Sequence, residues 1–99
     1  MKFGMQAVMT AQAGKGEELA TIMLEASALV ADMQGCEIHL VQQSVVDEAK
    51  VMSTEVWTSK ADHQASLANP WVRALIADAK PLIAGMEHHP ATPLGGKGL

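Results

Sequence analysis

The sequence has no tyrosine, only two tryptophans and one phenylalanine, and a single cysteine. With no second cysteine available, Cys36 cannot form a disulfide within the chain, which suits a reducing compartment. No uninterrupted apolar run is long enough to cross a bilayer. The amino-terminal segment alternates with period two and carries one lysine, so it indicates a strand rather than a signal peptide. We therefore expect a cytoplasmic protein.

Basic residues are also scarce and scattered. Seven Lys and Arg stand against eleven Asp and Glu, which gives a formal net charge of −4. Binding to nucleic acids or to anionic membranes requires clustered positive charge. The sequence therefore predicts neither partner.

Apolar residues, by contrast, are abundant for so short a chain. They make up 48% of the 99 residues. A chain of this length forms one small domain and buries roughly two thirds of its unfolded surface. This composition holds more apolar surface than one thin layer can hide, so we expect an oligomer.

Periodicity and turn residues divide the chain into a simple series of elements. Strand 3–11 alternates, and helix 17–33 repeats its apolar residues at three- and four-residue spacing. Ser59 and Asn69 are expected to cap two successive helices, and Pro81 to end the second of them. The full expected series is strand 3–11, helix 17–33, strands 36–46 and 49–58, helices 59–68 and 70–81, strand 86–93 and a Gly-rich tail 94–99.

This order predicts one α+β domain over residues 1–99. It is the ferredoxin-like βαββαβ arrangement with a split second helix, in which an antiparallel sheet has helices on one face. We expect Phe3, Met5 and Met9 on the uncovered face, stacked on the same face of a second copy in a barrel-like homodimer. In strand 36–46 the alternation places Cys36 with Ile38 and opposite His39.

A carboxyl group and a large ring stand close together where strand 49–58 ends. Glu55 and Trp57 are two residues apart, so both leave the same face of the sheet. This pair is either a core tryptophan beside a solvated acid or part of a site that binds an aromatic ring. Residue types alone favour the first interpretation.

Segments along nearly the whole chain resemble the antibiotic biosynthesis monooxygenase family, and within it the small quinol-monooxygenase-like proteins. The resemblance is carried by the opening FGM strand with AGKGEELA, by GCEIHLV, by EVWTSKADHQASLANPWVRALI and by PLIAGMEHHPATPLGGKGL. It implies a dimeric α+β barrel. It also implies that O₂ oxidises a hydroquinone- or anthrone-like aromatic without metal, flavin or haem. One position departs from the pattern, because His39 stands where many relatives have tyrosine.

Chemistry of this kind requires a base that titrates near neutrality, and histidine supplies one. His63, on the helix after Trp57, is the first candidate for base or substrate-orienting group; the alternative is a solvated helix histidine. His39 faces either the pocket or the dimer interface, since register decides this. His88 and His89 are adjacent in a strand and must point to opposite faces. The spacing of the four histidines does not predict a metal site.

Further residues are candidates for contacting a substrate. Glu55 accepts a hydrogen bond from a substrate hydroxyl, orients His39 across the hairpin, or is a structural acid at the sheet surface. Trp57 forms a flat wall or a core, and Trp71 lies at a mouth or an interface. Ser66 either donates a hydrogen bond to a substrate oxygen or is an ordinary helix serine. Met23 and Leu75 either line a cavity between helices and sheet or belong to the core.

Two alternatives to an oxygenase remain open. One is a non-catalytic dimeric module that binds a hydrophobic metabolite, because barrels of this type host many activities. The other is haem binding or degradation. The haem-binding relatives resemble one another in an asparagine on the first strand and a histidine on the helix after the tryptophan. This chain has Gln6 and Ala7 on the first strand, and Leu67 lies one turn beyond His63. The haem hypothesis is therefore disfavoured.

Overall fold

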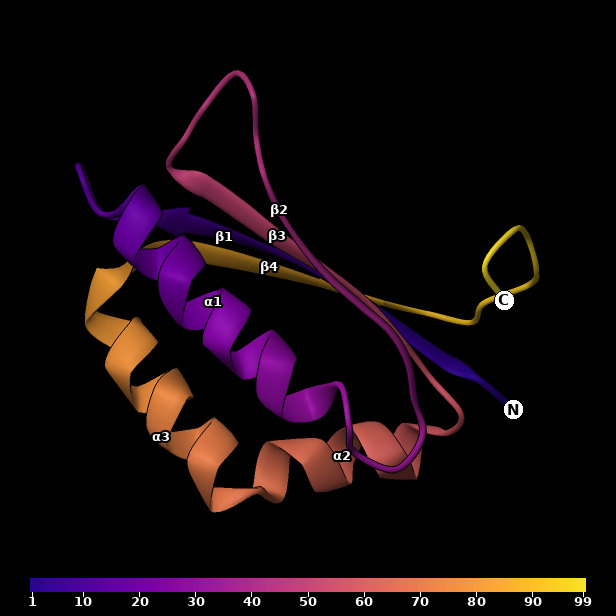
Figure 1. Ribbon diagram of the computed structural model, residues 1–99. Helices are drawn as coiled ribbons and strands as arrows, with labels where there is room; N and C mark the ends of the chain where they lie inside the picture. Colours follow the sequence, from indigo (N-terminus) through magenta and orange to yellow (C-terminus); the bar gives the residue numbers. More distant parts are fainter.

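The computed structural model describes residues 1–99 as a four-stranded antiparallel sheet with three helices on one side (Figure 1). The strand order is β2-β3-β1-β4, and every neighbouring pair is antiparallel. The elements are β1 (Phe3–Ala11), α1 (Gly16–Val30), β2 (Cys36–Gln43), β3 (Lys50–Trp57), α2 (Lys60–Ala68), α3 (Pro70–Ala79), a 3₁₀ turn (Lys80–Leu82) and β4 (Ile83–Ala91). The predicted ferredoxin-like βαββαβ order with its split second helix is confirmed. None of the helices is long and apolar enough to cross a membrane.

Local sequence signals begin and end the helices as expected. The Ser59 side chain accepts a hydrogen bond from the Asp62 N–H at the start of α2, and Asn69 accepts from the N–H groups of Trp71 and Val72 at the start of α3. Pro81 lies in the 3₁₀ turn that follows α3. These caps place α2 directly after the end of β3, where the candidate site lies.

Element boundaries differ from the expected ones by a few residues. Helix α1 ends at Val30 rather than at 33, because the chain turns through Gly35, which has φ +84°, to enter β2. A Cβ at Gly35 would lie 2.3 Å from a carboxylate oxygen of Asp62, so this turn packs closely against α2. Strand β4 begins at Ile83, three residues earlier than expected, because Ile83 already pairs with Ala11.

The expected orientation of the first strand is wrong. Met9 is 3% exposed and packs with Val51 and Leu19 under the helices, and Phe3 and Met5 belong to the same row of β1. This row is the more apolar of the two on β1. The helices therefore cover it, since burying apolar surface is the main stabilising force in such a layer.

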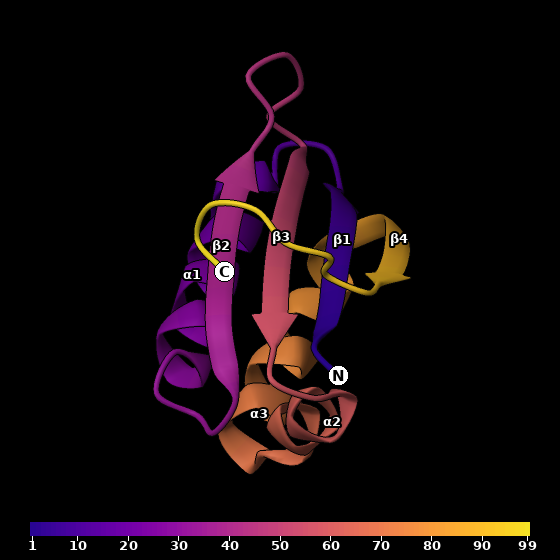
Figure 2. The ribbon, with the colours of Figure 1, turned by 90° about the vertical axis from the view of Figure 1, so that its right-hand side faces the viewer.

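The uncovered face carries the other row of each strand. It includes Val8, Met52, Val56, Ile38 and Leu40, and Leu40 is 49% exposed. The carboxyl-terminal tail crosses this face from β4 toward β2 (Figure 2). Two close approaches mark that path, since a Cβ at Gly4 would lie 3.3 Å from Pro93 and one at Gly98 would lie 3.9 Å from Ile38.

A bulge in β2 also overturns the expected placement of Cys36. Cys36 pairs with Trp57 and Ile38 pairs with Val56, which leaves Glu37 as an extra residue. The extra residue reverses the alternation, so Cys36 faces the helices and packs against the cluster formed by Val30, Trp57 and Val72. His39 faces the helices too, because its partner across the hairpin is Glu55.

Candidate active site

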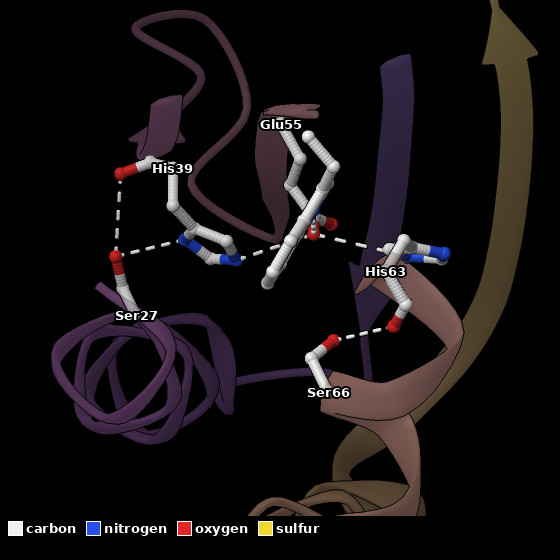
Figure 3. A network of polar contacts seen from close by, with 6 residues as sticks. Ser27, His39, Glu55, His63 and Ser66 are labelled. Carbon is white, nitrogen blue, oxygen red and sulfur yellow. Dashed lines mark hydrogen bonds and ion pairs between the residues drawn. The ribbon is translucent and has the colours of Figure 1, made fainter. Parts of the chain in front are cut away.

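Three side chains converge on one carboxylate oxygen beneath the helices (Figure 3). Trp57 Nε1 donates a hydrogen bond of 3.0 Å to Glu55 Oε1. His39 Nε2 lies 3.6 Å from the same oxygen, and His63 Nε2 lies 3.9 Å from it. All three contacts fall on Oε1 and none on Oε2, so the second oxygen of Glu55 has no partner among these groups.

The fold explains why these side chains meet. Glu55 and Trp57 leave the same face of β3, as their spacing predicts, and the hairpin places His39 directly opposite Glu55. Helix α2 starts immediately after β3 and brings His63 over this face, 5.0 Å from the ring of Phe3 and 5.9 Å from that of Trp57. The sequence leaves the orientation of His39 open. The structure places it on the side of the helices rather than on the uncovered face.

A serine of α1 completes the network and has no counterpart among the residues expected from the sequence. Ser27 Oγ lies 2.8 Å from His39 Nδ1 and 3.3 Å from the His39 carbonyl oxygen. Its sequence position gives one indication of this role. Ser27 lies in the apolar row of α1, between Met23 and Ala26 before it and Val30 after it, and a polar group facing inward there requires a hydrogen-bond partner.

Burial controls the charge of both imidazoles. It lowers the pKa of His39 and of His63 from the ordinary value of 6.5, while the negative charge of Glu55 opposes the change in each. His63 lowers the pKa of His39 further, and His88 does the same to the pKa of His63. Both rings are therefore neutral at pH 7 and can accept a proton there.

These lowered pKa values make stability depend on pH. In the unfolded chain each histidine takes up a proton near pH 6.5, whereas in the folded protein burial delays this to lower pH. The unfolded state then binds more protons, so stability is fully present above about pH 6.5 and is lost as the pH falls toward the lowered values. We expect the Tm to fall between about pH 7.5 and 5.5, and to fall less in His39→Gln. Calorimetry across this range checks the slope, and a Tm that stays constant or rises contradicts it.

The remaining candidate residues occupy different positions. Ser66 is buried and its hydroxyl donates to the His63 carbonyl oxygen at 2.6 Å, so it stabilises α2 at the base of the site. Trp57 has no exposed surface and reaches the site through its N–H. Trp71 is 72% exposed and lies in an open groove between α1 and α3.

The two histidines of β4 point to opposite faces of the sheet, as expected. His88 pairs with Ala7 and His89 pairs with Gln6, so His88 is on the side of the site.

An apolar cavity of about 210 Å³ lies between the helices and the sheet. Met23 and Leu75 line it, as the sequence suggests, and Leu75 also lines the outer groove beside Trp71. The cavity is formed by Met9, Ile22, Met23, Ala26, Leu75, Ile76, Ala79, Lys80, Ile83 and Met86. It lies on the same face of the sheet as Glu55, but none of Glu55, His39 and His63 lines it.

Comparison with known proteins gives a family. The model of the antibiotic biosynthesis monooxygenase family matches residues 2–78. The chain belongs to this family. A search of curated protein sequences found no significant match.

Several solved structures superpose closely on the chain. A family protein from Chloroflexus aurantiacus J-10-fl is 37% identical, with a TM-score of 0.88 over 97% of this chain and 96% of that one. A variant of SnoaB, a cofactor-independent oxygenase from Streptomyces nogalater, is 18% identical, with a TM-score of 0.84 over 97% and 96% of the two chains. Rv0793 from Mycobacterium tuberculosis is 12% identical, with a TM-score of 0.88 over 98% and 99%. The last two comparisons support the fold.

No three His, Cys, Asp or Glu side chains are placed to hold one metal ion together. The prediction that the chemistry proceeds without metal, flavin or haem stays a prediction.

Proposed function

We propose that the protein is a cofactor-independent monooxygenase that oxidises a small quinol- or anthrone-like aromatic with O₂. Membership of the family supports this proposal, and so does the description of SnoaB, which has the same fold, as a cofactor-independent oxygenase. The observation that carries it is a carboxylate set between two buried, neutral imidazoles. That group can remove a proton from a phenol in a place from which water is excluded.

His63 is the base in this proposal. Both ring nitrogens of His39 are engaged, Nδ1 with Ser27 and Nε2 with Glu55. His63 has only Nε2 directed at Glu55, and its Nδ1 makes no side-chain hydrogen bond. A substrate hydroxyl can therefore give its proton to Nδ1, and the imidazolium that forms is stabilised by the carboxylate beside Nε2.

Once deprotonated, the substrate supplies the electrons itself. A hydroquinone anion passes one electron to O₂, and the two radicals combine to form a carbon–oxygen bond. Loss of water from the resulting hydroperoxide leaves a hydroxyquinone, so that one oxygen atom enters the ring and the other leaves as water. His63 and Glu55 hold and return the proton, while the cavity lined by Met23 and Leu75 accommodates the apolar part of the molecule.

Oxygen consumption tests the proposed activity. The purified protein, without added metal or cofactor, is mixed with a panel of hydroquinones and anthrones while O₂ and quinone absorbance are followed together. We expect consumption of O₂ with equal formation of quinone above the buffer blank. Uptake that never exceeds the blank for any compound overturns the enzyme, and ligand binding without uptake would instead support the metabolite-binding module.

We also propose that two copies pack through their uncovered sheet faces. Only 15 of the 99 residues are buried in one copy, and the uncovered face presents Leu40 and its apolar neighbours. A soluble protein rarely leaves such a face in water. The tail that crosses this face (Figure 2) would become part of the interface.

Replacing Leu40 by glutamate is expected to give a monomer. In a symmetric pair the substitution buries two carboxylates without partners, which an interface does not tolerate. Light scattering after gel filtration gives the mass of each species. Leu24→Glu is the matched control, because Leu24 is 58% exposed on α1, away from the uncovered face. The proposed interface is wrong if Leu40→Glu keeps the native mass, or if Leu24→Glu is the variant that dissociates.

A further inference from the structure

Ser27 contacts a single residue of the neighbouring strand twice. Its hydroxyl lies 2.8 Å from His39 Nδ1 and 3.3 Å from the His39 carbonyl oxygen, and both contacts appear in Figure 3. The residue is half-buried on the inner side of α1, 12 positions before its partner. A helix serine that serves only its own helix bonds to a carbonyl of the preceding turn, as Thr21 does to Glu17. The hydroxyl of Ser27 is instead directed at the site.

Counting protons shows what these two contacts do. A serine hydroxyl donates one proton and accepts others, whereas each nitrogen of a neutral imidazole either donates or accepts. In neutral His39 the favourable arrangement has the hydroxyl donating to Nδ1, because Nε2 then carries its proton toward Glu55 Oε1, 3.6 Å away. The other tautomer would place a nitrogen lone pair opposite a carboxylate oxygen, which is repulsive.

A protonated ring requires the opposite arrangement. Nδ1 then carries a proton and can only donate, so it donates to Ser27 Oγ. The serine proton turns to the His39 carbonyl oxygen, which lies within reach at 3.3 Å. The hydroxyl proton changes its acceptor, and His39 Nδ1 has Ser27 as its partner in both states.

We propose that Ser27 is a positioning residue: its hydroxyl keeps His39 Nε2 directed at Glu55 in both protonation states of the ring. This holds Oε1 in place and leaves Oε2 and His63 to the reacting molecule. The contribution of Ser27 to catalysis rests on the proposed function, but the titration of His39 can be followed without any substrate. The titratable groups acting on the ring are Glu55 on β3 and His63 on α2, and α1 supplies the hydroxyl of Ser27.

The test follows the His39 imidazole by NMR during a pH titration in Ser27→Ala, Ser27→Thr and Thr21→Ala. Alanine favours a helix more than serine does, so α1 should keep its structure. We expect Ser27→Ala to lower the His39 pKa, because the hydrogen bond lost by the charged ring is stronger than the one lost by the neutral ring. Ser27→Thr keeps the hydroxyl and should restore the pKa. Thr21→Ala removes a hydroxyl elsewhere on α1 and should leave it unchanged.

Two results overturn the inference. One is a His39 pKa in Ser27→Ala that equals that of the Thr21→Ala control, and the other is a pKa that rises. If Ser27→Ala does not fold, Ser27→Cys replaces it, since a thiol is a weaker hydrogen-bonding partner, and the same results decide. A normal titration shift in a protein that oxidises no quinol would contradict the proposed function and leave the role of Ser27 in orienting His39 intact.

Discussion

His63→Gln is expected to lower the rate of oxygen uptake at saturating substrate by about 10²- to 10⁴-fold, the usual contribution of a positioned base. Glutamine is close to histidine in size and can still hydrogen-bond Glu55, but it takes up no proton at neutral pH. The loss should therefore fall on kcat, with little change in KM, because the apolar cavity is intact.

The shape of the pH profile provides a second measure of the same variant. In the native protein the rate should fall at acid pH as His63 becomes protonated, at a pH below the ordinary histidine value because burial lowers its pKa. His63→Gln should lack this limb. Gln64→Ala is the control, because Gln64 is the exposed neighbour on the same helix. If His63→Gln retains the rate of this control, a different group removes the proton.

Features that depend on a few adjacent residues were accessible from the sequence. The caps at Ser59 and Asn69 and the stop at Pro81 are local, and the structure confirms them. The shared face of Glu55 and Trp57 also follows from their spacing. The register that pairs His39 with Glu55 stayed open in the sequence, and the structure decides it.

Features that depend on how distant elements pack together could not be predicted from the sequence. The row of β1 that contains Met9 is the more apolar one, but its pattern does not say whether the helices or a second copy cover it. The bulge at Glu37 reverses the alternation of β2 without any proline or glycine inside the strand to mark it. The role of Ser27 could not be predicted, because its partner lies in another element and a serine in an apolar helix row does not reveal what it contacts.

Trp57→Ala is expected to cause the largest loss of stability of any single substitution in the site, about 3–5 kcal/mol. Trp57 has no exposed surface and packs with Val30 and Val72 in one of the two core clusters. A domain of this size is stabilised by only about 5–15 kcal/mol, so this variant should be largely unfolded at moderate urea concentrations. Urea unfolding followed by circular dichroism measures the loss, since the variant lacks this fluorophore.

Trp57→Phe separates the packing of this ring from its hydrogen bond. Phenylalanine keeps most of the apolar contact but cannot donate to Glu55 Oε1, which the indole N–H does at 3.0 Å. Val72→Ala is the matched control, because Val72 packs in the same cluster and its side chain has no polar group. If the N–H holds the carboxylate between the two imidazoles, Trp57→Phe should lose more activity than Val72→Ala at equal stability. Equal activities would mean that packing alone fixes Glu55, and that the indole serves the site only as part of its core.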